Sequence, residues 1–169
     1  MGSSNIGAAI DSGENLMTVL DLTAKDPRLS GYSGIYNIGQ YVILVPFKNS
    51  YEPKNGQRGH GLLTRVDMNA YDVTGISFVD LPQVTRQQTP SYNDKDLRGF
   101  SGGFANGMYG LLVPFYNGIF HGKLVRYNAI YGPLDVNMQE LDLTHDRVRG
   151  QVYKGYRGGF VSLWQAVFP

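Results

Sequence analysis

The sequence contains no cysteine, only one tryptophan and few charged residues. Without cysteine the protein has no disulfides, no cysteine nucleophile and no thiolate metal site, although this absence leaves its compartment unknown. No apolar stretch reaches the roughly 18 residues of a membrane-spanning helix, and we see no signal peptide, so direct membrane insertion is not expected. Because the net charge is +1, the sequence does not indicate nucleic acid or an anionic membrane as a partner.

Glycine and tyrosine are abundant instead, with 22 and 12 residues in a chain of 169. This length is sufficient for one domain with a hydrophobic core. Many glycines and aromatics with only 17% charged residues are typical of short strands joined by tight turns. We expect residues 1–16, which are rich in small and polar residues, to form a disordered lead-in, and residues 17–169 to form a single domain.

An internal repeat is the most informative feature of the chain. Residues 99–115 read GFSGGFANGMYGLLVPF, and residues 31–47 read GYSGIYNIGQYVILVPF. Residues 155–160 begin the pattern a third time as GYRGGF. A repeat indicates that one supersecondary unit is stacked on itself. A residue that occurs in only one copy is therefore freer to serve a function than one that occurs in every copy.

Each repeat divides into four predicted strands. In the second copy these are residues 99–105, 108–115, 122–128 and 137–143. The dipeptide Asn117-Gly118 between the second and third strands is a strong tight-turn signal. Because no segment shows sustained helical periodicity with caps, we predict an all-β protein of four-stranded antiparallel units.

The glycine pairs Gly102-Gly103 and Gly158-Gly159 resemble the double glycine of kelch-type β-propellers. Glycine permits the close backbone approach that the innermost strands of a propeller require. The chain is thus similar to a divergent, kelch-like or lectin-like propeller, although the resemblance transfers no functional residue. It implies two full blades and two part-blades, namely 30–81, 97–143, a partial blade 155–169 and a strand 17–22 from a preceding blade.

Fewer than three blades make an incomplete ring, because propellers close with ~4–8. An open array exposes strand edges that invite pairing with other chains. Three arrangements would solve this: several copies that complete one ring, a longer protein of which this chain is a part, or another subunit that covers the edges. We therefore expect a protein partner or other copies of the chain.

Aspartate and arginine recur at equivalent positions of the repeats. Asp80 and Asp142 correspond to Asp21, and Arg65 corresponds to Arg126 on the neighbouring strand. We predict the cross-strand pairs Arg65–Asp80 and Arg126–Asp142, each contributing ~0–1 kcal/mol. The alternative, carboxylates gathered in a catalytic cleft, conflicts with the repetition.

His60 and His121 are also equivalent, and each is followed by glycine. We expect each imidazole to bond to loop backbone and fix the geometry of its blade. A ligand site repeated once per blade is the alternative. Metal binding would require further converging ligands, which the sequence lacks, so we predict neither a metal nor another cofactor. His145 has no counterpart and is interpreted as a loop residue.

The best candidates for a contact surface are Tyr116, Asn117 and Phe120, because an aromatic residue on a turn has less structural reason to be there. Most other repeated aromatics are predicted to lie in the core between blades. The inserts 48–58 and 82–96 are the least repeated segments, and we expect any partner specificity there.

With no nucleophile constellation, no phosphate loop and no charged patch, the chain is interpreted as a non-enzymatic binding or scaffold module within a larger or oligomeric assembly. One alternative is a carbohydrate-binding propeller lectin with repeated sites. A second is a fragment of a glycan-active propeller enzyme, for which Asp94, Asp96 and Glu140 are the loose candidates. The identity of the ligand or partner stays open.

Overall fold

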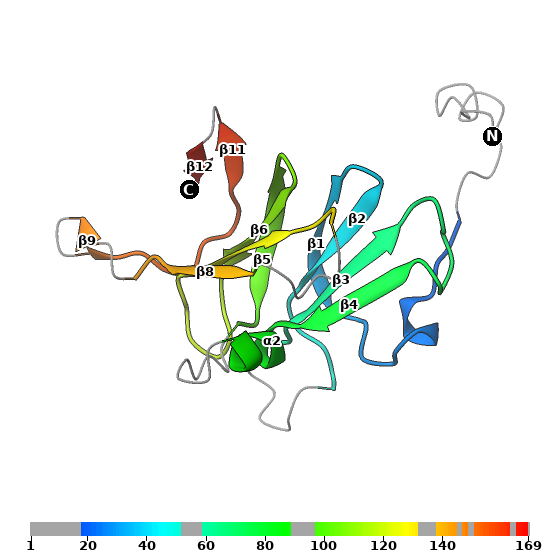
Figure 1. Cartoon of the computed structure of the whole chain (residues 1–169). Helices are drawn as coiled ribbons and strands as arrows, with labels where there is room; N and C mark the ends of the chain where they lie inside the picture. Colours follow the sequence, from blue (N-terminus) through cyan, green and yellow to red (C-terminus); the bar gives the residue numbers. More distant parts are fainter. Residues whose placement is uncertain are drawn as a thin grey trace, which may run out of the picture.

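A computed structural model describes the chain over residues 18–51, 59–88, 97–131, 138–144, 147–148, 151–162 and 165–168. The described part consists mainly of two four-stranded antiparallel sheets and contains little helix (Figure 1). The prediction of an all-β protein is therefore confirmed. The expected lead-in over residues 1–16 and the loop residue His145 lie outside the described residues.

Both sheets are meanders in which each strand pairs with the next one along the chain. The first sheet contains β1 (Tyr32–Ile38), β2 (Tyr41–Pro46), β3 (Leu62–Asp67) and β4 (Ile76–Asp80). The second contains β5 (Phe100–Asn106), β6 (Tyr109–Pro114), β7 (Lys123–Asn128) and β8 (Gln139–Asp142). The four strands predicted for the second repeat are all present, with ends shifted by one or two residues.

Short elements surround the sheets. They are the 3-10 helix η1 (Leu22–Ala24), the helix α2 (Leu81–Gln88), and the hairpins β9 (Arg147–Val148) with β10 (Gln151–Val152) and β11 (Phe160–Ser162) with β12 (Gln165–Val167). The strand predicted over 17–22 is not present in its described part, because residues 18–21 form no strand and Leu22 begins η1. The sequence analysis also missed α2, although Pro82 in its first turn is a typical helix-start residue.

The first strands of the three repeats lie side by side, with β5 between β1 and β11 (Figure 1). The hydroxyl of Ser33 in β1 donates to the carbonyl oxygen of Phe100 at 2.6 Å. In the same way, Ser101 in β5 donates to the carbonyl of Tyr156, just before β11, at 2.7 Å. In each of the first two repeats, one serine thus ties the first strand to the following repeat.

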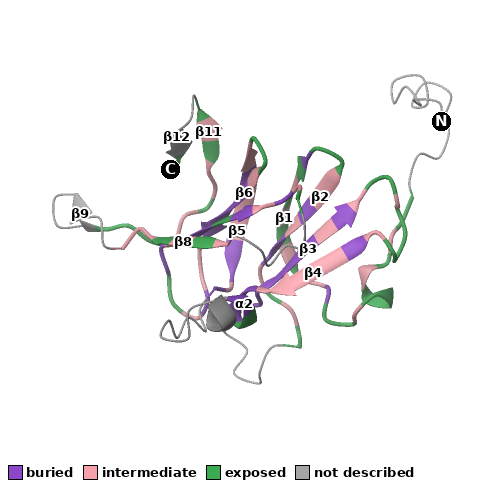
Figure 2. Ribbon diagram, in the orientation of Figure 1, coloured by how far each residue is buried: buried purple, intermediate pink, exposed green. Residues whose placement is uncertain are grey.

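The largest hydrophobic cluster lies where the two sheets face each other. It includes Ile43, Val45, Leu63, Leu112, Val125 and Tyr127. These side chains come from alternate positions of their strands, as expected when one face of a strand is buried. Figure 2 shows the buried residues concentrated on the strands and the exposed residues concentrated on the turns. Complete burial of each such side chain contributes ~1.5–3 kcal/mol, so this cluster holds the sheets together.

Close packing between repeats explains the second glycine of each pair. A Cβ atom on Gly103 would lie 2.5 Å from the ring of Tyr36, whereas a Cβ on Gly102 would meet nothing within 4 Å. Gly159 has the same relation to Phe104, at 2.9 Å. The corresponding residue of the first repeat is Ile35, which is 67% exposed. A side chain is tolerated at position 35 because no aromatic ring of a preceding repeat lies against it in the described residues.

Candidate functional site

His60 is buried and links its own repeat to the next one. Its Nδ1 accepts from the main-chain N–H of Leu62 at 3.3 Å, and its Nε2 lies 3.0 Å from the carbonyl oxygen of Gly31 and 3.3 Å from the main-chain nitrogen of Phe47. The main-chain carbonyl of His60 accepts from the N–H of Gly99 in the second repeat, at 3.3 Å. The imidazole also contacts the ring of Tyr32 edge to face.

His121 makes the equivalent contacts one repeat further along. Its Nε2 lies 3.4 Å from the carbonyl oxygen of Gly99, its main-chain carbonyl accepts from the N–H of Gly155 at 2.9 Å, and its ring meets Phe100 edge to face. Gly31, Gly99 and Gly155 all have φ between 68° and 77°, a conformation that favours glycine. The histidine and glycine of each repeat therefore form one structural unit at the junction of two repeats.

Burial is the main cause that lowers the pKa of His60, and the charge of Arg98 acts in the same direction. The carbonyl of Gly31 opposes this shift because it accepts a hydrogen bond from the ring. Within the described part of the chain, no cluster of three or more histidine or acidic side chains could hold a metal ion.

The predicted pair of Arg65 with Asp80 is wrong. The register of β3 and β4 places Arg65 opposite Ser77 and Asp80 opposite Leu62. Since positions 62 and 65 are an odd number of residues apart, their side chains lie on opposite faces of the sheet. Arg65 instead donates to the hydroxyl of Ser77 at 3.2 Å and to the carbonyl of Ala129, in the second repeat, at 3.0 Å.

The predicted pair of Arg126 with Asp142 is wrong for the same reason. Arg126 lies opposite Gln139 and donates to its side-chain oxygen, whereas Asp142 lies opposite Lys123. The guanidinium of Arg126 also lies over the ring of Tyr109, 4.7 Å from its centroid. Arg65 lies over Tyr41 in the same way, at 4.4 Å, so arginine on tyrosine is the contact that the repeats share.

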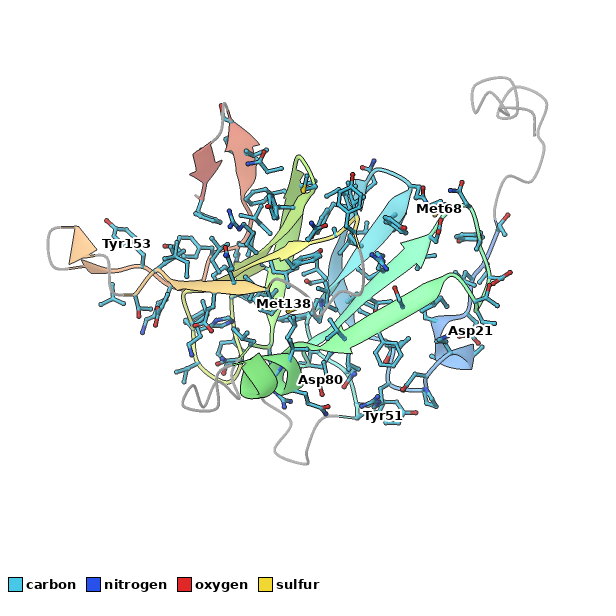
Figure 3. All side chains as sticks on the ribbon, in the orientation of Figure 1. Asp21, Tyr51, Met68, Asp80, Met138 and Tyr153 are labelled. Carbon is cyan, nitrogen blue, oxygen red and sulfur yellow. The ribbon has the colours of Figure 1, made fainter. Side chains whose placement is uncertain are left out.

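Two of the three recurring aspartates bind the threonine that follows two residues later. Asp142 accepts from the N–H and the hydroxyl of Thr144 at 2.9 and 2.6 Å, and Asp21 accepts from Thr23 at the same distances. These bonds lower the pKa of Asp21. Asp80, which precedes Leu-Pro in place of Leu-Thr, lies where β4 meets α2 (Figure 3). The pattern Asp-Leu-Thr was the sequence signal for this local capping role.

The turn that carries Tyr116, Asn117 and Phe120 presents aromatic and aliphatic side chains to solvent. Tyr116 and Phe120 form a β-bridge, and their rings meet edge to face with centroids 5.4 Å apart. Phe120 is 48% exposed, and Ile119, which the sequence analysis did not single out, is 72% exposed. Asn117 is only 6% exposed, so it belongs to the interior of the turn.

A shallow pocket of about 320 Å³ lies beside this turn and was not predicted. It is lined by Ser33, Phe47, Ser101, Phe115 and Arg157. The guanidinium of Arg157 lies 5.2 Å from the centroid of the Phe115 ring, and the rings of Phe47 and Phe115 are 6.1 Å apart. The available signal was a break in the repeat, because residue 157 is arginine where the other copies have Ser33 and Ser101.

A second hollow, of about 620 Å³, lies on the side of the second sheet that faces away from the first. It is lined by Leu111, Leu124, Arg126, Gln139, Glu140 and Leu141. The hairpin of β11 and β12 covers one part of this side, where Val161 and Phe168 pack against Phe104 and Val113. Leu141, further from the hairpin, is 54% exposed. The equivalent residue of the first sheet is Val79, which packs against the hydrophobic cluster between the two sheets.

The carboxylates considered for glycan chemistry do not define a cleft in the described residues. Asp94 and Asp96 lie outside them. One side-chain oxygen of Glu140 lies 4.0 Å from the Nζ of Lys123. Likewise, residues 52–58 and 89–96, which form most of the two inserts, lie outside the described residues.

These observations define the chain as an all-β repeat protein built on a four-stranded antiparallel unit. Comparisons with protein-family models, with curated proteins and with solved structures find no match to it. In the part of the chain that the structure describes, no helix has the length and apolar character needed to cross a membrane.

Proposed function

We propose that the chain is a non-enzymatic binding or scaffold module of the β-propeller type, which acts within a larger or oligomeric assembly. One observation carries this proposal. The second sheet covers the side of the first sheet that faces it. The equivalent side of the second sheet is only partly covered, by the β11–β12 hairpin, among the described residues. Leu141 is 54% exposed beside the hollow on this side, whereas the equivalent Val79 is partly buried against the second sheet, and this difference supports a partner on the second sheet.

The architecture of the repeat indicates what such a partner supplies. In the two complete sheets, the second strand pairs with a third, β2 with β3 and β6 with β7. In the third repeat, β12 pairs with β11 alone among the described residues. A partner that packs on this side of the second sheet and adds strands beside β12 would cover the exposed side chain of Leu141, the binding mode known as β-strand addition. Arg126 would then reach a partner carbonyl, as Arg65 reaches Ala129.

Light scattering tests whether this partner is a second copy of the chain. We expect a discrete multimer across a range of concentrations. We also expect Leu141→Lys to shift it toward monomer, because the substitution places a charge on the open side of the second sheet, the side that faces away from the first sheet. Val73→Lys is the matched control, because Val73 is also exposed but lies in the turn between β3 and β4. A wild-type monomer at every concentration would contradict self-assembly and leave a different protein as the partner.

The exposed turn favours carbohydrate binding as a second candidate function. The rings of Tyr116 and Phe120 are partly accessible, and aromatic faces are common stacking surfaces for sugars. In this case Tyr116→Ala should abolish glycan binding in a titration while the far-UV circular dichroism stays unchanged. His121→Ala should also abolish binding, but its effect must be separated from loss of the junction that His121 forms. Unchanged glycan affinity in Tyr116→Ala would count against this function.

A further inference from the structure

Residue 157 departs from the repeat at a position that is otherwise structural. Ser33 and Ser101 occupy this position in the first two copies, and each hydroxyl donates to a main-chain carbonyl of the next repeat. Arg157 replaces this short hydroxyl with a long cation, and its side chain is exposed beside the pocket of Phe47 and Phe115. An arginine is not needed to join repeats, because serine does so twice in the same chain.

The surroundings of Arg157 leave its charge available to a ligand. No described carboxylate forms an ion pair with Arg157, and the groups lining the pocket with it are two phenylalanine rings and two serine hydroxyls. The ring of Phe115 supports the guanidinium at 5.2 Å, a contact that orients the planar group without neutralising it. A guanidinium held in this way can bind a carboxylate through two parallel hydrogen bonds.

The serines add a second element of recognition. Each hydroxyl proton is engaged with a main-chain carbonyl, so the oxygen of Ser33 and that of Ser101 can accept a hydrogen bond from a ligand hydroxyl. The exposed parts of Phe47 and Phe115 can pack against the carbon ring of a sugar. One cation matches a single negative charge better than the double charge of a phosphate group.

From this combination we propose that the pocket of Ser33, Phe47, Ser101, Phe115 and Arg157 binds a hydroxylated ring acid of the uronic acid type. The carboxylate would lie against Arg157, the sugar ring against the phenylalanines and the ring hydroxyls against the serine oxygens. This site is separate from the open side of the second sheet, so the inference goes beyond the proposed role in assembly.

The test uses the full chain and titrates it with glucuronate and, in parallel, with glucose, which has the same ring but no carboxylate. Protein NMR shifts or calorimetry report the binding. We expect saturable binding of glucuronate and at least about tenfold weaker binding of glucose, which corresponds to about 1.4 kcal/mol. Absence of saturation at about 10 mM glucuronate, or equal affinity for both sugars, would overturn the proposal.

Two variants assign the binding to Arg157. Arg157→Ser introduces the residue that the other repeats carry, so the melting temperature should stay close to that of the wild type while glucuronate affinity falls at least about tenfold. Arg28→Ser is the matched control, because Arg28 also lies over an aromatic ring, that of Phe78, but is already paired with Asp26. Retained affinity in Arg157→Ser would refute the site. Light scattering of the same variants reports the assembly state independently, so the two proposals can fail separately.

Discussion

At the scale of single residues, a pair of tyrosines shows how one junction between repeats is specified. The hydroxyls of Tyr36 in the first sheet and Tyr127 in the second bond to each other between the sheets. Burial is the main cause that raises the pKa of both hydroxyls, so both stay protonated at neutral pH. The equivalent positions in the other repeat hold Phe104 and Val66, which carry no hydroxyl. The polar contact is therefore particular to this junction.

Replacement of Tyr127 by phenylalanine should destabilise the protein. The substitution keeps the ring but leaves the hydroxyl of Tyr36 without its partner, so we expect the free energy of unfolding to fall by about 1–2 kcal/mol in urea denaturation. The double variant Tyr36→Phe/Tyr127→Phe should recover part of this loss, because no buried hydroxyl is left unsatisfied. A double variant less stable than the sum of the two single changes would contradict this explanation.

His60 should make stability depend on pH in the mildly acidic range. Its pKa in the folded protein lies below the ordinary histidine value of 6.5, so the unfolded chain binds a proton more readily. The contribution of neutral His60 is complete above pH 6.5 and is lost progressively as the pH falls below that value. Thermal unfolding between pH 7.5 and about pH 5 should show this loss, and His60→Gln should flatten the dependence. An unchanged slope in His60→Gln would assign the effect to other groups.

At the scale of strands, the two glycines of the Gly102-Gly103 pair differ, because close packing requires only the second of them. Gly103 in β5 faces the ring of Tyr36, whereas Gly102 beside it has open space. Both glycines are conspicuous in the sequence, but only the second has a neighbour that excludes a side chain. The same division holds for Gly158 and Gly159.

Gly103→Ala should therefore destabilise the protein, and Gly102→Ala should not. The Cβ of the first variant would lie 2.5 Å from the Tyr36 ring and 2.6 Å from the carbonyl oxygen of Leu111, and overpacking of this kind costs about 1–3 kcal/mol. Gly102→Ala is the matched control, with an expected change below about 0.5 kcal/mol. Chemical denaturation of the two variants decides the point, and equal losses would show that the close approach at Gly103 is unimportant.

At the scale of the whole molecule, the three repeats are unequally protected. Among the described residues, the second sheet packs against the first sheet on one side and against the β11–β12 hairpin on the other. An isolated two-stranded hairpin is marginally stable, so β11 and β12 depend on their contact with Phe104 and Val113. We therefore expect a partner to stabilise β11, β12 and the partly covered side of the second sheet.

Hydrogen exchange should show that the β11–β12 hairpin is less stable than the second sheet. We expect the amides of β11 and β12 to exchange faster than those of β6, which pairs with a strand on each side. Conditions that favour assembly should slow exchange in β12, and Leu141→Lys should remove that protection. Equal exchange in β6 and β12 of the unassembled protein would contradict the expectation that β12, which pairs with β11 alone among the described residues, is less stable than β6.

The sequence predicted the strands well because their signals are local and occur twice. Alternating apolar residues, the repeated Val-Pro-Phe and the Asn-Gly turn act over a few neighbouring positions. The pairing of Arg65 with Asp80 failed because it depends on register, and a shift of one position moves a side chain to the opposite face. Arg157 was missed because its pocket joins residues from three separate repeats.

By itself the sequence determined the all-β class, the four-stranded unit and the positions at which the copies differ, since repeated local patterns encode these properties. Only the tertiary structure decided which glycines are required, which repeated side chains form junctions, and which side of the second sheet is left open. These outcomes depend on contacts between residues some 50 to 90 positions apart, such as Tyr36 with Tyr127 and Ser101 with Tyr156. Packing of one repeat against another creates such contacts, and no local pattern specifies them.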